Sequence, residues 1–217
     1  VLLKMQQKLQ QSKTDDVLEI DLLNQGYIRV IGIDEAGRGS WAGPLAVASY
    51  EYDLNDELLT QVTDSKLINE DKRLDIYRKL DSKRFFIVYA TVAEIDKLNI
   101  YQATIVKIKE IIQRYNNKHT FFLIDGKFNI DFGTNTLQVV KGDLKHYSIA
   151  AASIVAKVSR DKVMIEFAKT YPAYCFAKNK GYGTNSHQQA LKQNGLCDLH
   201  RKSFAPIKEI IDNVKQC

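Results

Sequence analysis

The sequence predicts an α/β protein with a mixed β-sheet flanked by helices and a helical C-terminal extension. Apolar runs rich in β-branched and aromatic residues come first, and amphipathic helices are interleaved with the later ones. Residues 171–217 contain helix-length pieces and loops. With 217 residues, 45% hydrophobic and 26% charged, the chain is long enough for one domain with a substantial core.

The first part of the chain predicts a helix followed by two strands. Residues 1–25 are polar and rich in Gln and Lys with scattered leucines, which is typical of a helix packed on the body of a protein. Residues 27–33 and 45–52 are strand-like, the second because apolar and polar side chains alternate along it. The two strands can form a hairpin around the loop between them.

The middle of the chain predicts two helices with a strand between them. Asn69-Glu70-Asp71 combines a capping residue with two acids that oppose the helix dipole, so we expect a helix to begin there. Residues 85–92 predict a strand by their aromatic and β-branched content. Between 105 and 115 isoleucines recur at helical spacing, with charged residues on the opposite side.

Two strands and one long helix follow. Residues 120–124 and 137–140 predict the strands. Residues 147–169 predict a helix whose alanines permit close approach to a sheet, and Tyr171-Pro172 ends it.

From these elements we expect three segments within a single domain: an N-terminal helical segment (1–26), a core of strands and helices (27–170) and a C-terminal helical region (171–217).

Composition restricts the class of protein. Lys and Arg number 31 against 26 Asp and Glu, a net charge of +5 that weakly favours a polyanionic partner. The three cysteines form no CxxC pair, so neither a disulfide framework nor a structural zinc site is supported. Lys4 interrupts any signal-peptide core, and the apolar stretch 147–156 is too short to span a bilayer. We expect a soluble, cytoplasmic monomer without membrane contact.

Acidic residues follow three of the predicted strands. Asp34 and Glu35 come after the first, in VIGIDE, Asp125 ends FFLID, and Asp143 ends VVKGD. Because the ends of neighbouring strands meet in space, these carboxylates can form one cluster. Adjacent strand residues face opposite sides, so Asp34 and Glu35 converge only if the strand is already ending at Ala36-Gly37. Each acid taken alone can instead cap a turn or a helix.

A cluster of carboxylates predicts either shared protons or bound cations, because so many like charges cannot all stay ionised without compensation. Oxygen ligands select hard ions, Mg²⁺ or Mn²⁺ rather than Zn²⁺. Two such ions roughly 4 Å apart can stabilise both oxygens of a phosphoryl displacement. Asp161 competes with Asp143 for the fourth position, but it lies inside the long helix, where a surface ion pair or an outer-shell contact is the simpler interpretation.

Eight motifs, in order and at similar spacing, resemble bacterial ribonuclease HII: IDEAGRG, AGP, TDSKL, IDGK, VKGD, ASIVAKVSRD, KGYGT and HRKSF. The resemblance covers residues 27–206. It implies a ribonuclease H-like fold and an endoribonuclease that hydrolyses RNA in RNA–DNA hybrids. It also implies incision 5′ of single ribonucleotides in duplex DNA, giving 3′-hydroxyl and 5′-phosphate ends, with roles in ribonucleotide and primer removal.

The same resemblance implies roles for particular residues. The acids that would be catalytic and bind two Mg²⁺ or Mn²⁺ ions are Asp34, Glu35, Asp125 and Asp143. The loop of Gly37, Arg38 and Gly39 would contact the ribonucleotide and the junction after it. Glycines let a backbone approach a sugar closely, and the 2′-hydroxyl is what distinguishes RNA from DNA. Tyr182 in KGYGT matches the family's junction-sensing tyrosine, although a core tyrosine between glycines is the plain alternative.

Further substrate contacts are expected at four polar residues that resemble phosphate-binding positions: Ser65, Lys66, Arg160 and Lys180. Such contacts position a duplex without reading its bases. Each of these side chains can equally be a solvated surface residue. His200 in HRKSF can assist product release or contact the backbone, but a lone histidine there is more often structural.

The sequence departs from the family pattern at two places. Ser40-Trp41 stands where members usually have Pro-Leu, and IDGK stands where IDGN is common. Neither change touches an expected metal ligand. Trp41 adds an aromatic ring to the substrate loop, and the simplest interpretation is that it packs under the loop.

Two other functions fit parts of the pattern. Another metal-dependent nuclease of this fold, such as a junction resolvase, would need the acids but not the GRG loop, and it would cut all-DNA junctions. A non-enzymatic nucleic-acid-binding module would explain the basic charge but not four acids at three strand ends.

Overall fold

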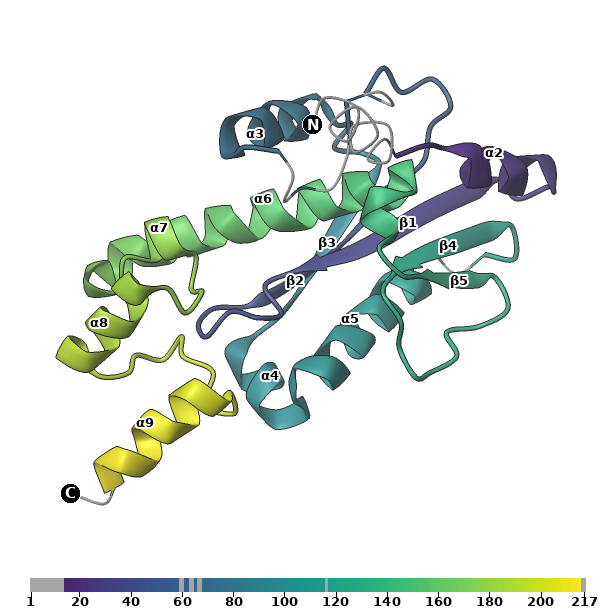
Figure 1. The fold of residues 1–217 in the computed structure, drawn as a ribbon. Helices are drawn as coiled ribbons and strands as arrows, with labels where there is room; N and C mark the ends of the chain where they lie inside the picture. The colour runs from purple at the N-terminus through teal and green to yellow at the C-terminus, as the bar shows by residue number, and fades with distance from the viewer. Residues whose placement is uncertain (1–13, 59–60, 63–64, 66–67, 116, 216–217) are drawn as a thin grey trace, which may run out of the picture. The chain divides into compact units, whose positions relative to one another are not determined.

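The structure is a computed structural model that describes residues 14–58, 61–62, 65, 68–115 and 117–215 (Figure 1). The chain forms two compact units. The sheet unit contains the described parts of Val1–Glu35, Val47–Val88 and Ile108–Val158. The helical unit contains the described parts of Ala36–Ala46, Tyr89–Lys107 and Ser159–Cys217.

A five-stranded sheet with the order β3-β2-β1-β4-β5 is the centre of the fold. Its strands are β1 (Arg29–Ala36), β2 (Leu45–Glu51), β3 (Phe85–Ala90), β4 (Thr120–Asp125) and β5 (Thr136–Val139). β4 pairs in parallel with β1 and with β5, with Ile33 opposite Ile124 and Asp125 opposite Val139. The carboxyl ends of these three strands therefore meet at one edge, as the strand-end acids predicted. β2 lies next to β1, the neighbour expected for the hairpin.

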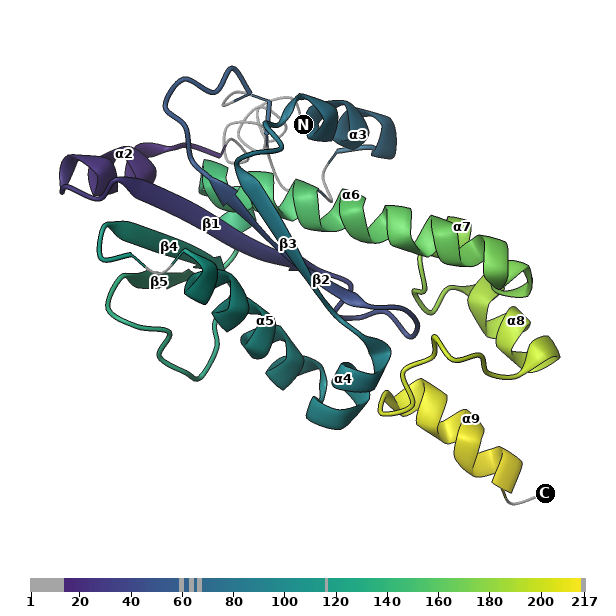
Figure 2. The same cartoon turned by 180° about the vertical axis from the view of Figure 1, so that it is seen from behind.

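Helices connect and follow the strands. They are α2 (Val17–Asn24), α3 (Glu70–Lys79), α4 (Val92–Leu98), α5 (Ile100–Arg114), α6 (Tyr147–Thr170), α7 (Phe176–Asn179), α8 (Asn185–Asn194) and α9 (Ala205–Lys215), with 3₁₀ turns η1 (Gly142–Leu144) and η2 (Pro172–Tyr174). In the sheet unit, the part of α6 before Ser159 and the part of α5 after Lys107 run on either side of the central strands (Figures 1 and 2). The predicted mixed sheet with flanking helices and a helical C-terminal region is thus confirmed.

The first half of α6 packs directly on β1. A Cβ added at Gly32 would lie 2.1 Å from the carbonyl carbon of Ser148, so no other residue fits at this crossing without a shift. The alanines that follow, Ala150, Ala151 and Ala152, are fully buried. The alanine-rich sequence therefore serves the close approach that was predicted for it.

Several boundaries differ from the predictions. β1 does not end at Ile33 but continues to Ala36, because its two acids extend the strand instead of terminating it. Thr91 and Val92 are not strand residues. Thr91 caps α4 with a capping box to Glu94, which makes a short helix after β3 that the sequence analysis missed. The helix expected from 105 begins five residues earlier, at Ile100.

Other helices lie where the sequence predicted them. Asn69 caps α3, and its side chain accepts a hydrogen bond from the Lys72 N–H at 2.8 Å. The expected N-terminal helix is α2 where the chain is described, and residues 1–13 of that prediction lie outside the described residues. Within the described ranges, no helix is both long and apolar enough to cross a membrane.

Candidate active site

The four predicted acids all lie in the sheet unit, at the edge where the parallel strands end. Asp34 and Glu35 are in β1, Asp125 is the last residue of β4, and Asp143 lies in η1, just after β5. The parallel register places these strand ends side by side. Strand pairing thus brings together residues that are far apart in the sequence.

Electrostatics show that the acids act on one another. Asp34 is 4% exposed, and burial raises the pKa of its carboxyl well above the usual range. Repulsion from Glu35, Asp125 and Asp143 raises this pKa further. The four carboxylates therefore form one cluster of negative charge.

Backbone groups hold two of these carboxylates in place. Asp34 Oδ1 accepts a hydrogen bond from the Glu35 N–H at 2.6 Å, and Asp125 Oδ1 accepts one from the Gly142 N–H at 2.7 Å. A Cβ at Gly142 would lie 3.3 Å from Asp125 Oδ1 and 2.5 Å from Ile149 Cδ1. Glycine at this position therefore allows the turn that carries the fourth acid to close against the end of β4.

The donor set suits a hard divalent cation. All four side chains offer carboxylate oxygens, and a cation would offset the repulsion that raises the pKa of Asp34. As the side chains stand, no three or more of the described His, Cys, Asp and Glu residues form a group that could hold a metal ion. Two of the oxygens point to backbone N–H groups instead. The residues therefore fit the ion chemically, with side-chain adjustment on binding.

The predicted substrate loop of Gly37, Arg38 and Gly39 lies in the helical unit, and we call its whole connection between β1 and β2, residues 37–44, the substrate loop below. Gly37 is buried with a φ of +95°, and a Cβ there would meet Arg160 Nε at 2.0 Å. Arg38 and Gly39 are exposed, and a Cβ at Gly39 would meet no atom within 4 Å. The first glycine is thus required by the fold, whereas the second faces open space.

Two fully buried arginines hold this loop through its backbone. Arg160 donates from Nε to the Pro44 carbonyl (2.8 Å), from Nη2 to the Ala42 carbonyl (3.1 Å) and from Nη1 to the Lys180 carbonyl (2.9 Å). Arg201 donates from Nε to the Gly43 carbonyl (2.9 Å). Burial lowers the pKa of both guanidiniums, and for Arg201 the neighbouring Arg160 charge lowers it further.

The segment that carries Tyr182 packs on the same loop. The Gly181 carbonyl accepts hydrogen bonds from the N–H groups of Trp41 (2.8 Å) and Ala42 (3.2 Å). A Cβ at Gly181 would lie 2.3 Å from the Ala42 carbonyl oxygen, and one at Gly183 would lie 2.3 Å from the Trp41 ring. Trp41 therefore packs against Gly183, and both glycines are needed for the contact.

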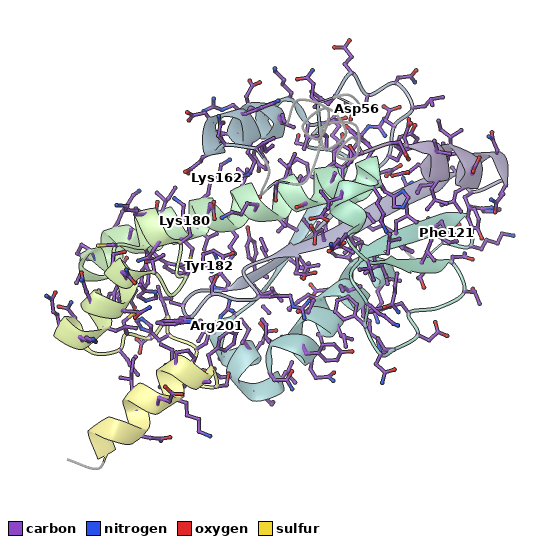
Figure 3. The ribbon with its side chains drawn as sticks, viewed as in Figure 1. Asp56, Phe121, Lys162, Lys180, Tyr182 and Arg201 are labelled. Atoms are coloured by element: carbon purple, nitrogen blue, oxygen red, sulfur yellow. The ribbon has the colours of Figure 1, made fainter. Side chains whose placement is uncertain are left out.

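Tyr182 itself is half-buried, with the Arg160 guanidinium carbon 5.4 Å from its ring centroid. Figure 3 labels Lys180, Tyr182 and Arg201, which lie close together in the helical unit. The loop and the tyrosine that were predicted to contact substrate are thus neighbours in one compact unit.

The other predicted contacts make internal bonds in the structure. The Lys180 side chain is 9% exposed, and its Nζ donates to the Ala177 carbonyl. In the sheet unit, Ser65 Oγ lies 2.8 Å from Ser153 Oγ in a buried hydrogen bond. Lys66 lies outside the described residues. Asp161, the alternative fourth acid, is buried in α6, and its charge only partly opposes the lowering of the Arg160 pKa by burial. Phosphate contacts at the four polar positions stay predictions.

Sequence analysis missed three buried residues of the helical unit. Arg201 was not singled out, His187 gave no usable signal, and His200 was interpreted as a lone histidine. His187 and His200 in fact form a pair, with their Nε2 atoms 3.1 Å apart. The only sequence signal for Arg201 and His200 was their place in HRKSF.

A mixed, helix-flanked sheet with acids at the ends of its parallel strands is the arrangement of a ribonuclease H-like fold. A family model described as Ribonuclease HII matches residues 31–207, so the chain belongs to the ribonuclease HII family. The resemblance seen in the motifs is confirmed. The protein is a metal-dependent phosphodiester hydrolase with ribonuclease H activity on RNA–DNA hybrids.

Known proteins support this assignment. A ribonuclease HII from Endomicrobium trichonymphae is 41% identical over 195 residues, covering 88% of this chain and 92% of that relative. The fold is similar to the crystal structure of ribonuclease H2 from Pyrococcus horikoshii OT3 (TM-score 0.72, 24% identity), with 88% of this chain and 100% of that chain covered. A structure of Bst ribonuclease HIII in complex with Mn²⁺ has a TM-score of 0.62 at 18% identity, covering 90% of this chain and 73% of that one.

Proposed function

We propose that the protein incises DNA duplexes on the 5′ side of a single embedded ribonucleotide, in addition to cleaving RNA–DNA hybrids, and that it acts as a monomer. The observation that carries this proposal is the contact between the exposed Arg38-Gly39 loop and the Tyr182 segment through Gly181 and Ala42. One element can contact a ribose while the other tests the next sugar. Such a pair would recognise a junction, which a continuous hybrid does not contain.

The open space at Gly39 supports a backbone contact to the substrate. An exposed position with no atom within 4 Å of its Cβ direction leaves room for a sugar. The 2′-hydroxyl is both donor and acceptor, so backbone N–H and C=O groups can recognise it without a particular side chain. The Tyr182 ring offers a face on which a sugar or base can stack.

We further propose that two Mg²⁺ or Mn²⁺ ions are held by four acids: Asp34, Glu35, Asp125 and Asp143. When bound, such ions supply Lewis acidity to the attacking water and to the departing 3′-oxygen, giving 3′-hydroxyl and 5′-phosphate ends. The protein's own part is to place the four carboxylates at one edge of the sheet, where the backbone N–H groups of Glu35 and Gly142 orient Asp34 and Asp125 before an ion binds. The Mn²⁺ complex of the related ribonuclease HIII supports the choice of ion.

The charge distribution favours a duplex partner. The net charge is +5 although the four acids are gathered at one sheet edge, so basic residues predominate elsewhere. Phosphate contacts of this kind make binding depend on salt. We propose that the activity removes single ribonucleotides and primers from DNA.

The test is an incision assay with three labelled substrates: a DNA duplex with one ribonucleotide, a uniform RNA–DNA hybrid and an all-DNA duplex. Each is incubated with Mg²⁺, Mn²⁺ or EDTA. We expect a nick 5′ of the ribonucleotide that depends on the metal and is absent from the all-DNA duplex. Cleavage of the hybrid alone would refute junction recognition, and cutting of all-DNA junctions would favour a resolvase.

A further inference from the structure

His187 and His200 form a buried hydrogen-bonded pair in the helical unit. Both are fully buried, and their rings are 5.3 Å apart between centroids with Nε2 atoms separated by 3.1 Å. His187 lies in α8, in the first turn after its capping residue Thr184. His200 precedes Arg201 and pairs with Ala42 of the substrate loop in an isolated antiparallel bridge. The pair therefore connects two segments that matter for substrate recognition.

The outer nitrogens of the pair also have partners. His187 Nδ1 lies 3.0 Å from the Tyr182 carbonyl oxygen. His200 Nδ1 lies 2.9 Å from the Cys197 N–H nitrogen and 3.1 Å from the Cys197 carbonyl oxygen. The chain of contacts runs from Cys197 through both rings to the backbone of Tyr182.

When both rings are neutral, one arrangement of protons makes a hydrogen bond of every contact in this series except that of His200 Nδ1 with the Cys197 carbonyl oxygen, which accepts from the His200 N–H instead. A carbonyl oxygen only accepts, so His187 carries its proton on Nδ1 and donates to Tyr182. Its Nε2 is then an acceptor, so His200 must carry its proton on Nε2 and donate to His187. His200 Nδ1 is left as an acceptor for the Cys197 N–H. Every bond points the same way, toward Tyr182.

The surroundings keep both rings neutral. Aromatic rings of Trp41, Tyr174 and Phe176 contact the pair, with Tyr174 edge-on to His200 at 5.1 Å between centroids. Burial lowers the pKa of both histidines and outweighs their hydrogen bonds to the Tyr182 and Cys197 backbones, which raise it; for His200 the neighbouring His187 lowers the pKa further. The neutral form of each ring is therefore favoured.

We propose that His187 and His200 are positioning residues that fix Tyr182 against the substrate loop and thereby set the preference for a ribonucleotide junction over a continuous hybrid. This inference rests on the proposed function, in which Tyr182 senses the junction. The Tyr182 carbonyl accepts from His187 and also from the Thr184 N–H at 2.8 Å, so the histidine supplies one of two anchors. The backbone bridge between His200 and Ala42 connects the other histidine of the pair to the substrate loop. Without the pair, the position of Tyr182 relative to the loop would depend on the Gly181 and Thr184 bonds alone.

Amide side chains test the direction of each bond, because Asn places its N–H near the Nδ1 position of histidine and Gln near the Nε2 position. His187→Asn keeps the donor to Tyr182, whereas His187→Gln loses it. His200→Gln keeps the donor to His187, whereas His200→Asn loses it. A role in packing alone would favour Gln at both positions, because Gln is closer to histidine in volume.

The experiment measures kcat/KM for the full chain on the single-ribonucleotide duplex and on the uniform hybrid. We expect His187→Asn and His200→Gln to keep the ratio of the two values within about threefold of wild type. We expect His187→Gln and His200→Asn to lower it on the order of tenfold, mainly through the junction substrate, as for one lost buried hydrogen bond. His119→Asn, in the sheet unit, is the matched control and should leave the ratio unchanged.

Equal ratios in the two His187 variants, or a ratio that follows side-chain size, would overturn the proposal. A wild-type enzyme that cuts hybrids but shows no junction preference would overturn the proposed function itself, and the two failures are thus distinct. A second measurement does not need any variant. Long-range ¹H–¹⁵N NMR of the histidine-labelled protein should show an Nδ1–H tautomer for His187 and an Nε2–H tautomer for His200. Any other pair of tautomers would contradict the proposed series of hydrogen bonds.

Discussion

Arg201 Nη1 donates a hydrogen bond of 3.1 Å to the carbonyl oxygen of Arg38, 163 residues earlier in the chain. This bond joins a fully buried guanidinium to the most exposed part of the substrate loop. A buried residue of the C-terminal region therefore helps to fix the loop backbone, so the loop's conformation depends on residues far from it in sequence.

Replacing Arg201 with lysine should destabilise the protein on the order of 2–4 kcal/mol, because the single ammonium nitrogen lacks the planar fork through which Nε and Nη1 reach the carbonyls of Gly43 and Arg38 separately. Urea unfolding measures the change. Arg78→Lys, on the exposed face of α3, is the control and should change stability by less than about 0.5 kcal/mol. Equal stability of the two variants would contradict the role given to Arg201.

The two glycines of the loop should respond differently to alanine. Gly37→Ala should cost on the order of 1–3 kcal/mol or more, because its φ is +95° and the new Cβ would meet Arg160. Gly39→Ala should fold with nearly wild-type stability, since the Cβ meets nothing. Its effect should appear only as weaker cleavage of both ribonucleotide substrates. Full activity of folded Gly39→Ala would show that the substrate does not approach there.

Asp125→Asn should lower cleavage on the order of a hundredfold or more while the fold persists. Asparagine keeps the Oδ1 acceptor for the Gly142 N–H but loses the charge that a divalent ion requires. Rates in Mg²⁺ and Mn²⁺, with a melting curve for each protein, provide the measurement. Asp131→Asn is the matched control, because the exposed Asp131 Oδ1 likewise accepts from a backbone N–H, that of Gly133, at 2.8 Å. Wild-type rates for Asp125→Asn would remove Asp125 from the metal set.

Tyr182→Ala should reduce incision at a single ribonucleotide roughly tenfold more than cleavage of a uniform hybrid, because the lost stacking matters most at the junction. Tyr182→Phe keeps the ring beside Arg160 and should stay close to wild type on both substrates. The measurement is the ratio of the cleavage rate on the single-ribonucleotide duplex to that on the uniform hybrid, taken for each of the two variants. Parallel losses on both substrates would assign Tyr182 a structural role.

The contribution of His200 to the free energy of unfolding should fall as the pH decreases from 7.5 to 5. Burial lowers the pKa of His200 to about 4, below its ordinary value of 6.5, so the unfolded chain takes up the proton first. The contribution is complete above pH 6.5 and is lost as the pH falls toward 4, which amounts to about 2 kcal/mol at pH 5. Asp34 and Glu19, whose pKa values burial raises, change stability in the opposite direction, so the comparison must be with His200→Gln. That variant should lose about 2 kcal/mol less than wild type between the two pH values; an identical loss would show that His200 is not buried and neutral.

Local patterns in the sequence predicted the sheet and the acidic cluster because both depend on strand ends. Asp125 and Asp143 each follow an apolar strand, and parallel pairing then brings them to one edge. The end of β1 was misplaced because Asp34 and Glu35 are polar, although Asp34 is buried. The short α4 escaped notice because its seven residues carry almost no periodic signal.

Local sequence patterns could not predict which charged side chains are buried. Arg160 was expected to contact phosphate, but its guanidinium makes three hydrogen bonds to carbonyls inside the helical unit. Carbonyl acceptors belong to every residue type, so no sequence pattern marks them. The His187–His200 pair could not be predicted for the same reason, because its outer hydrogen-bond partners are backbone groups of Tyr182 and Cys197.

The hydrogen bonds from Arg160 and Arg201 to the substrate loop also have a consequence for how this enzyme can evolve. The two guanidiniums bind main-chain carbonyls at Arg38 and at 42–44, so these bonds do not depend on which side chains the loop carries. The Ser40-Trp41 pair, which departs from the usual Pro-Leu, is one substitution that this arrangement tolerates. Where the loop is exposed, at Arg38, the side chain can therefore change, or be randomised in a library, to alter substrate preference while the loop backbone stays in place.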